Sequence, residues 1–492
     1  MFRLLQRLLL PVFVLALLIG LLNIKDNFGY DPIGEVSSYD ASSDLLTPVF
    51  SLRRAPKLLT SPLASQKLEQ EISNLVNTLP GSSCLTISSP SERIYDHQID
   101  IPLVPGGTQK LLTAYSAIKQ IGKDYQYETI IAAVRETEAD GLLRTSDLFI
   151  FGSGDPLIRT DSYASLLPET YSQIRTNADE IADLTVGMNI LFIQGAVVVD
   201  ETRYDEERTV PGWSSELKET ALTGSLSAAL FDGGYDGLKQ NYSSQRNEDD
   251  PPALTPSVDP AKRFAANFDD LLEARNVVIL KAAKESNGTQ LEDLIELLSI
   301  KSPTMDLIVK QMLTNDDTVT AEMLLKEIGY SRQGTGSTGA GLVSVPEIIN
   351  SAGIDNSRLL LIDGSGSSPE NQITCNLINA ILMDSSTKDI LREALPLAGV
   401  EGIVASQFIG TQFEGKLEAH AMGTEENAAI AGYFTTTSGT DLAISFIANK
   451  AVAEENFEQK IDSFIEGIAN VISAYTGGQP LDELGPLQNP SS

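Results

Sequence analysis

The segment PGGTQKLLTAYSAIKQIG, residues 105–122, carries the clearest structural signal in the chain. Pro105 and two glycines precede a run from Lys110 to Ile118 whose apolar residues recur at helical spacing, and Gly122 follows that run. Proline and glycine before such a run, and glycine after it, are typical of a helix with a defined start and end. The segment therefore predicts a helix.

The preceding residues predict one more helix and two strands. LEQEISNLVNTL, residues 68–79, has apolar residues at helical spacing and predicts an amphipathic helix where the folded body begins. After a turn at residues 80–82, the runs 84–87 and 93–95 are typical of strands. The body thus begins as helix, strand, strand.

Further along, the pattern changes twice. Residues 127–136, 142–156 and 190–205 contain strand-like runs, and about 135–295 is strand-rich. Near residue 295, IELLSIKSPTMDLIVKQML begins a helical periodicity, and 300–400 is helix-rich. AGYFTTTSGTDLAISFIANK, residues 431–450, predicts a hairpin of a central sheet.

Composition limits the classes of function. The 492 residues are 42% hydrophobic, enough for a substantial core, which excludes a disordered or fibrous protein. The 67 acidic residues exceed the 35 basic ones, giving a net charge of −32, so the average surface would repel nucleic acid. Two histidines and two cysteines are too few and too isolated for a zinc site, and we expect no metal or cofactor.

The two cysteines, Cys84 and Cys375, leave two alternatives open. A disulfide is permitted if the body is exported, but nothing in the sequence requires one. Neither cysteine has a Lys, Arg or His beside it to make the thiol reactive. We therefore favour two buried free thiols.

The N-terminus predicts export. Residues 8–24 carry no charge, and Arg3 and Arg7 before them favour a cytoplasmic N-terminus. We expect residues 1–25 to be a transmembrane signal anchor that holds the body outside the cytoplasm at the cell membrane. The alternative is a cleaved signal peptide and a secreted protein.

Low-complexity segments flank the body. Residues 26–65 are rich in Ser, Asp, Gly and Pro without sustained periodicity, and they predict an extracytoplasmic stalk. Residues 477–492 contain little apolar content and predict a disordered tail.

Two glycine-rich segments invite functional interpretations. GTGSTG, residues 334–339, matches a dinucleotide-binding pattern, but a helix ending at Gly329 precedes it where a strand is required, so a loop is expected. DGSGSSPENQIT, beginning at Asp363, follows LLLI at 359–362, which predicts a buried strand. A strand ending in such a turn is found both at ligand pockets and at ordinary connections.

Many segments together, in order over about residues 45–475, resemble the D-alanyl-D-alanine carboxypeptidase/endopeptidase family of penicillin-binding proteins, the PBP4-like class C group of peptidase family S13. They are TPVFSLRRAP, PGGTQKLLTAYSAIKQIGKDY, GSGDP, GAVVVDETRYD followed by GW, SPTMDLIVKQML, TAEMLLKEIG, LLLIDGSGSS, LPLAGVEGIVASQFIGT and the AGY hairpin. The resemblance implies an α/β penicillin-binding domain, similar to serine β-lactamases and transpeptidases, built from residues 66–133 and 296–476. A strand-rich insertion, 134–295, of two nested subdomains would interrupt it.

The family uses Ser-x-x-Lys, Ser-x-Asn and Lys-Thr-Gly motifs. The serine attacks the D-Ala-D-Ala carbonyl and the first lysine takes up its proton. The resemblance implies that Lys110 is retained, whereas the nucleophile position is Gly107. The adjacent Thr108 cannot substitute, because one helical residue rotates a side chain by about 100° away from the face of Lys110.

The other two motifs are also altered. Aligned on Ala321-Glu322, the second motif becomes Asp316-Asp317-Thr318, so that Asp316 could form an ion pair with Lys110. Aligned through Gly423-Thr424, the third becomes Ala421-Met422-Gly423, and it loses the lysine. His420, one residue earlier, could supply partial charge, but a surface histidine is the simpler expectation.

The resemblance thus implies candidate residues of two kinds. The altered catalytic set is Gly107, Lys110, Asp316 and Thr318. The altered substrate-binding set is Ala421, Gly423 and Thr424, together with Asp363 and Ser365 of the intact DGSG turn. We interpret the chain as an inactive relative that acts in cell-wall metabolism by binding peptidoglycan stem peptides or a cell-wall synthesis protein. The alternative is an active carboxypeptidase/endopeptidase with a displaced nucleophile.

Overall fold

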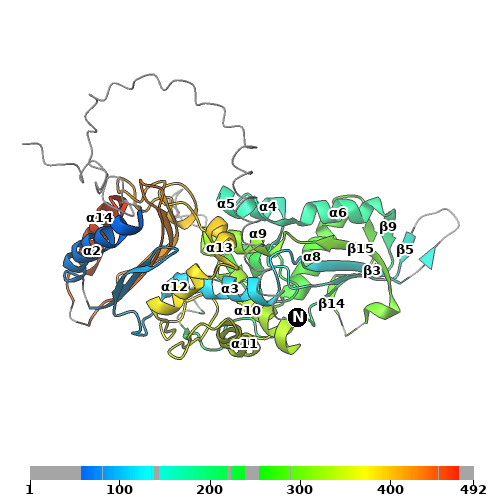
Figure 1. The fold of residues 1–492 in the computed structure, drawn as a ribbon. Helices are drawn as coiled ribbons and strands as arrows, with labels where there is room; N and C mark the ends of the chain where they lie inside the picture. Colours follow the sequence, from blue (N-terminus) through cyan, green and yellow to red (C-terminus); the bar gives the residue numbers. More distant parts are fainter. Residues whose placement is uncertain are drawn as a thin grey trace, which may run out of the picture. The chain divides into compact units, whose positions relative to one another are not determined.

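The structure, a computed structural model, describes residues 57–475 apart from residues 80, 135, 138–142, 216, 217, 219–222, 239–253, 287, 289 and 453 (Figure 1). These residues belong to one compact unit, Lys57–Gln479. The predicted membrane segment 1–25, the stalk as far as residue 56 and the tail 477–492 lie outside them. Within the described ranges, no helix combines the length and the apolar character that a membrane crossing requires.

A five-stranded antiparallel sheet joins the two ends of the described chain. Its strands follow the order β16-β17-β18-β1-β2. Their bounds are Leu417–Gly423 (β16), Asn427–Thr435 (β17), Asp441–Asn449 (β18), Ser82–Ser88 (β1) and Arg93–His97 (β2). β17 and β18 confirm the predicted hairpin, and β1 pairs along the whole of its length with β18.

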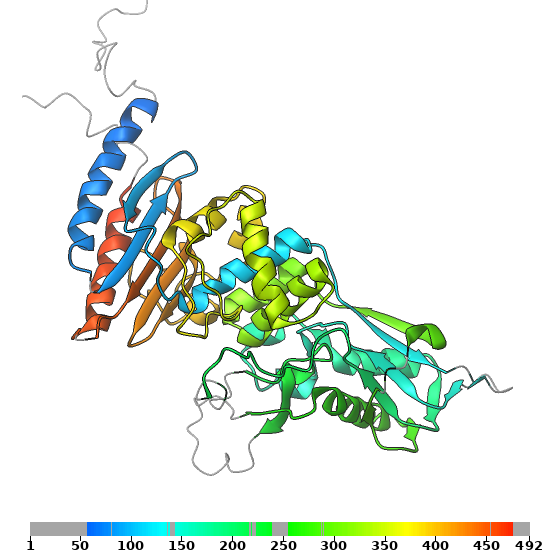
Figure 2. The same cartoon turned by 90° about the horizontal axis from the view of Figure 1, so that it is seen from below.

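Two helices from opposite ends of the chain, α2 (Lys57–Val76) and α14 (Phe457–Ser473), cover one face of this sheet (Figure 2). They bury apolar residues at helical spacing, such as Ile72 on α2 and Phe464 on α14. The helix predicted at residues 68–79 is therefore present, but it begins earlier. Residues 57–65, which the composition assigned to a stalk, form its first part.

A layer of helices covers the other face and forms the largest core of the molecule. They are α3 (Lys110–Gln120), α9 (Met305–Asn315), α10 (Thr318–Gln333), α11 (Thr338–Ser351), α12 (Cys375–Met383) and α13 (Lys388–Ala394). α3 is the predicted helix, and a short 3₁₀ turn, η2 (Gly106–Gln109), leads into it. α10 does not end at Gly329 as expected. That glycine instead lets α11 approach closely, because a Cβ there would lie 2.8 Å from the Gly341 nitrogen.

The predicted loop at residues 334–339 joins α10 to α11. Gly334 ends α10 with φ of +71°, and the Ser337 side chain accepts a hydrogen bond from the Ala340 N–H at the start of α11. The segment 359–362 does not form the predicted buried strand. It makes a single bridge, Leu360 with Gln372, and Leu360 is 46% exposed.

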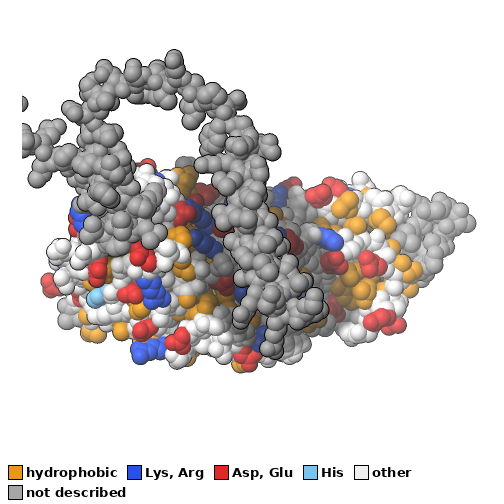
Figure 3. Space-filling model, viewed as in Figure 1, with side chains coloured by type: hydrophobic (Ala, Val, Ile, Leu, Met, Phe, Trp, Pro, Cys, Tyr) orange, Lys and Arg blue, Asp and Glu red, His pale blue; other side chains and the backbone are white. Residues whose placement is uncertain are grey.

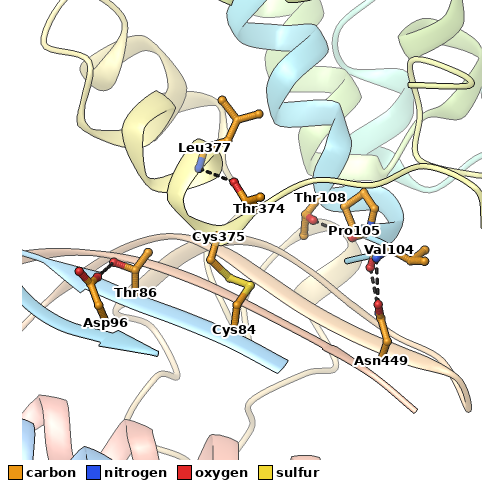
Figure 4. Close-up of a disulfide and its surroundings, with 10 residues drawn as sticks. All are labelled: Cys84, Thr86, Asp96, Val104, Pro105, Thr108, Thr374, Cys375, Leu377 and Asn449. Carbon is orange, nitrogen blue, oxygen red and sulfur yellow. Dashed lines mark hydrogen bonds between the residues drawn. A yellow bond between two sulfur atoms is a disulfide. The ribbon is translucent and has the colours of Figure 1, made fainter. Parts of the chain in front are cut away.

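Cys84 and Cys375 form a disulfide, so the expectation of two free thiols was wrong (Figure 4). The bond links β1 of the sheet to the first residue of α12 in the helical layer. The cysteines are 291 positions apart in the sequence, so no local signal indicated this pairing. The link joins the two layers that enclose the largest core.

The strand-rich region contains two larger sheets and several short elements. The five-stranded sheet has the order β14-β10-β6-β3-β15, and the four-stranded sheet β13-β9-β5-β4. Bounds are β3 Glu128–Ala133, β4 Glu136–Thr137, β5 Leu143–Thr145, β6 Leu148–Phe151, β7 Ile158–Arg159, β8 Thr176–Asn177, β9 Ile190–Ile193, β10 Val197–Asp200, β11 Tyr235–Leu238, β12 Leu254–Pro256, β13 Val278–Ile279, β14 Lys284–Glu285 and β15 Ile295–Lys301, with helices α4 Asp161–Ala164, α5 Glu169–Ser172, α6 Ala178–Gly187 and α8 Pro260–Glu273.

One element at the edge of this region differs from its prediction. Ile295–Lys301 was expected to begin a helix, but it is a strand, β15, that pairs antiparallel with β3. The helix α9 begins only at Met305. The chain thus enters and leaves this sheet on neighbouring strands, and the sheet extends a few residues beyond the predicted insertion limits 134 and 295.

Candidate functional site

A cleft lies where the start of α3, the α9–α10 junction, the DGSG turn and the edge strand β16 meet. It encloses a cavity of about 500 Å³ lined by hydroxyl and amide groups together with Lys110 and Asp316. Gly107, Thr318, Ser365 and Thr424 also line it. The cleft therefore gathers residues from all three altered motifs and from the DGSG turn.

Lys110 and Asp316 form the ion pair that the sequence predicted. Lys110 is buried at the start of α3, and its Nζ donates to Asp316 Oδ1 at 2.5 Å and to the Ser365 carbonyl oxygen at 3.0 Å. Asp316 ends α9 with φ of +55°, a left-handed conformation that aspartate tolerates. This conformation places its carboxylate at the cleft.

His420 is a third member of the same cluster. It is fully buried, so the expectation of a surface histidine was wrong, and its Nε2 lies 3.1 Å from Asp316 Oδ1. Burial alone would raise the pKa of the Asp316 carboxyl. The charge of Lys110 and the hydrogen bond from His420 outweigh that effect and hold the pKa of Asp316 below its ordinary value. Asp316 is therefore a carboxylate at neutral pH.

Gly107, the predicted nucleophile position, has no space for a side chain. A Cβ at Gly107 would lie 2.6 Å from Asp316 Oδ1 and 2.8 Å from His420 Cε1, closer than Cβ atoms approach other atoms. The Gly107 N–H donates to the sulfur of Met422 at 2.9 Å. The side chains of Asp316 and His420 thus occupy the space of a serine side chain, and Met422 accepts the hydrogen bond of the backbone N–H beside it.

Thr108 points away from this cluster. Its hydroxyl is buried and donates to the Pro105 carbonyl oxygen at 2.7 Å (Figure 4). The rotation along the helix therefore separates this hydroxyl from Lys110, in agreement with the sequence argument.

The strand β16 places the residues of the predicted third motif on two faces. Side chains alternate along β16, and those of His420 and Met422 face the cleft. Ala421 instead packs into the core under α14, and Gly423 lines a different cavity on that side. Ala421 and Gly423 therefore do not line the cleft as predicted, and the alternation along a strand could have indicated this.

The DGSG turn rests on a buried polar network that the sequence did not predict. Asp363 Oδ2 accepts hydrogen bonds from Trp213 Nε1 and the Ser368 N–H, at 2.8 and 2.7 Å, and Oδ1 accepts from the Gly366 N–H at 2.7 Å. Glu322 accepts from the N–H groups of Gly364 and Ser365 at 2.8 to 3.1 Å. The network holds the Ser365 carbonyl toward Lys110.

Glu322 is the strongly perturbed group in this network. Burial, followed by the neighbouring Asp363 carboxylate, raises the pKa of Glu322 to about 8, although hydrogen bonds from the Ser365 side chain and from the backbone N–H groups of Gly364 and Ser365 act in the opposite direction. The segment TAEMLL and the dipeptide GW contain Glu322 and Trp213, but they lie far from Asp363 in the sequence. Only the fold brings the three side chains together.

The described part of the chain contains one cluster with metal-ligand spacing, Asp269, Asp270 and Glu273 on α8. None of these residues lines the cleft. The cleft itself offers one carboxylate, already paired with Lys110, and one histidine bound to that carboxylate.

Comparison with known proteins gives concordant results. The model of the D-Ala-D-Ala carboxypeptidase 3 (S13) family matches residues 68–255 and 245–468. A D-alanyl-D-alanine carboxypeptidase of Actinomadura sp. strain R39 is 24% identical over 427 residues, covering 74% of this chain and 76% of that protein. A carboxypeptidase of Mycobacterium tuberculosis is 24% identical over 377 residues, with 75% and 76% covered.

The fold comparison agrees. The crystal structure of penicillin binding protein 4 from Haemophilus influenzae superposes with a TM-score of 0.64 at 17% identity, covering 82% of this chain and 99% of that one. A predatory endopeptidase of Bdellovibrio bacteriovorus, solved with an immunity protein, gives 0.52 at 15% identity, covering 80% and 94%. At these identities the similarity concerns the fold alone.

Proposed function

Because the chain belongs to the D-Ala-D-Ala carboxypeptidase 3 (S13) family, we propose that it acts in peptidoglycan metabolism as a member that binds cell-wall components without cleaving them. Acyl transfer in such a cleft needs a nucleophile, a base to take its proton, and N–H donors for the developing oxyanion. In this chain the nucleophile position is Gly107, and both the retained Lys110 and the Gly107 N–H are bonded to other side chains.

The observation that carries the proposal is the position of Asp316. Its carboxylate lies where the side chain of a nucleophile at position 107 would extend. It also engages Lys110, the only family lysine retained in the cleft, whose Nζ donates to Asp316 and to the Ser365 carbonyl. An ammonium held as a donor to two oxygens cannot accept a proton from a nucleophile.

The oxyanion site is altered as well. The backbone N–H of Gly107, beside the absent nucleophile, donates to Met422 Sδ. A substrate oxygen could use this N–H only after Met422 moves. Removing the nucleophile alone lowers the rate of such enzymes by several orders of magnitude, and here the donor changes too.

The proposal includes a location. We infer that residues 1–25 anchor the protein in the cell membrane and that the body lies outside the cytoplasm. The Cys84–Cys375 disulfide supports this, because disulfides persist in oxidising compartments. A cell-wall synthesis protein is then the alternative partner to the stem peptide.

The test compares binding with turnover. We expect Nα,Nε-diacetyl-Lys-D-Ala-D-Ala, titrated into the full chain, to give a binding isotherm but no release of D-alanine above the buffer rate. Release of D-alanine that Lys110→Ala abolishes would favour the active enzyme with a displaced nucleophile. Absence of both binding and release would favour a protein partner for the cleft over the stem peptide.

A further inference from the structure

A second cavity, of about 590 Å³, lies beside α14, and it meets the cleft at the end of β16, where Met422 and Thr424 line both. It runs between α14, the end of β16 and residues 406–411, and we call it the α14 groove. Its walls are apolar and include Phe408, Ile409 and Ile461. Ile409 is 64% exposed and adds to the apolar surface of this groove.

Small residues keep the groove open. Ala421 and Gly423 on β16 and Ala428 on β17 form its floor, where larger side chains would fill the space. Ala421 and Ala428 are themselves almost fully buried from solvent. The groove is therefore a feature of the sheet and of α14, and not a gap between loops.

One rim of the α14 groove is a row of carboxylates. Glu458, Asp462 and Glu466 are exposed, line the groove, and follow one another at four-residue intervals, so that they share one side of α14. Like charges at this spacing destabilise a helix by about 0.2–0.5 kcal/mol per pair. Among the residues that the structure describes, none of the three has an ion pair with Lys or Arg, and no Lys or Arg lines the groove.

The other rim is neutral, with Ser406, Gln407 and Thr411. Acidic side chains are scattered over the face of the described chain that Figure 3 shows, so charge alone does not mark a docking site. The distinguishing feature is a row of carboxylates along only one side of an open apolar groove. A complementary ligand must carry an apolar face and positive charge along one of its edges.

We propose that the α14 groove binds a helical segment of a partner protein, with one apolar face and Lys or Arg residues along one side of that face. A helix fits because the carboxylates recur about once per turn of α14, roughly every 5 to 6 Å, and basic residues at four-residue intervals on a second helix recur at the same spacing. Docking of an amphipathic helix into an apolar groove is a common mode of recognition. The proposal does not depend on what the cleft binds.

The experiment uses the full chain and a fluorescein-labelled peptide of about 15 residues, long enough to form a helix on binding. The peptide contains Leu and Ala on one face and Lys at every fourth position beside it. One comparison peptide has Glu in place of Lys, and another has the same composition in shuffled order. Fluorescence anisotropy measures binding.

We expect the ordered basic peptide to bind and both comparison peptides to bind at least about tenfold more weakly, a difference of about 1.4 kcal/mol. Asp462→Lys should weaken binding by a similar factor, and Ala428→Phe, which fills the groove, should abolish it. Glu285→Lys is the matched control, because Glu285 is an exposed carboxylate on β14 outside the groove. It should change binding by less than about twofold, which bounds the general effect of net charge.

Two kinds of result would overturn the proposal. The first kind is non-specific attraction to an acidic protein. It would appear as equal weakening of peptide binding by Asp462→Lys and Glu285→Lys, or as equal binding of the ordered and shuffled peptides. The other concerns the occupant. A photo-cross-linking residue at position 409 should join the added peptide, whereas a cross-link to residues 1–56 or 476–492, or to a second copy of the chain, would show that the protein fills its own groove.

Discussion

The floor and the face of the cleft are built differently. The floor, which consists of Asp363, Glu322 and the groups that bind them, directs its hydrogen bonds inward to the turn at 363–368. The face, which consists of Gly107, Asp316 and His420 with Lys110 and Met422, has side chains that pair with one another. The floor therefore serves the fold, and the face pairs Lys110 with Asp316 without a ligand, while the buried Nδ1 of His420 has no hydrogen-bond partner among the residues that the structure describes.

The difference shows which residues the fold requires. Buried polar groups without partners cost about 1–3 kcal/mol each, so a change in the floor exposes several such costs at once. A change in the face is tolerated when the new groups find partners, as Asp316 does with Lys110 and His420. The predictions below follow from this contrast, from the largest expected effect to the smallest.

Asp363→Ala should have the largest effect. It leaves the Trp213 indole N–H and two backbone N–H groups buried without acceptors, so we expect the free energy of unfolding to fall by more than about 3 kcal/mol. Urea denaturation measures it. Asp355→Ala, at an exposed position, is the control and should cost much less. A loss below about 1 kcal/mol for Asp363→Ala would show that the floor does not depend on this carboxylate.

Cys84→Ser combined with Cys375→Ser should reduce the free energy of unfolding by about 2–4 kcal/mol, because the disulfide restricts the unfolded chain. Reduction of the wild-type protein should shift the urea midpoint in the same direction, and it should leave the midpoint of the double variant unchanged. Equal shifts in both proteins would assign the effect of the reductant to something other than this bond.

Gly107→Ser tests the face. The new side chain must displace Asp316 or His420, so we expect a loss of about 1–3 kcal/mol in the free energy of unfolding and no acylation by penicillin. Gly107→Ala, which adds the Cβ without a hydroxyl, separates crowding from chemistry and should lose nearly as much stability. Acylation of the serine variant would show that the remaining face is still competent.

The pH dependence should be the smallest effect when it is expressed per pH unit. A raised carboxyl pKa means that the folded state binds more protons than the unfolded state between the two pKa values, so stability falls as pH rises through that window. For Glu322, whose folded pKa is about 8, the decrease between pH 6 and 8 should reach at most about 1.4 kcal/mol per pH unit. Glu322→Gln should reduce this decrease of the free energy of unfolding with pH. An unchanged slope would mean that Glu322 stays ionised.

Asp316 should change the free energy of unfolding with pH in the opposite direction. Its depressed pKa stabilises the folded state above about pH 4, the ordinary carboxyl range, and this contribution is lost as pH falls further. Asp155 and Asp232, whose burial raises each pKa to about 6, add to the decrease up to about pH 7. The difference between the slopes of the wild-type protein and Glu322→Gln therefore isolates the contribution of Glu322.

The sequence predicted the parts of the site that lie on one helix or follow a motif. The helix α3 and the Lys110–Asp316 pair were predicted, the first from periodicity and the second from the family resemblance. His420 was expected at the surface, because the sequence does not show that β16 directs this side chain toward Asp316. The strand β15 was mistaken for helix, since a short apolar run fits both periods.

The rest depends on contacts between distant segments. Glu322, Asp363 and Trp213 lie far apart in the chain, and no local pattern links them. The disulfide joins residues 291 apart, and the groove beside α14 forms from three separate segments. Such contacts follow from the packing of the layers, which sequence patterns do not specify.

The most direct test of the central claim is the intact mass of the full chain after incubation with benzylpenicillin. The claim is that the face of the cleft contains no functional nucleophile, because Asp316 fills the space beside Gly107. The mass should remain that of the unmodified protein under conditions that acylate an active family member completely. A stable adduct of one penicillin per chain, mapped to a hydroxyl in the cleft, would contradict the claim.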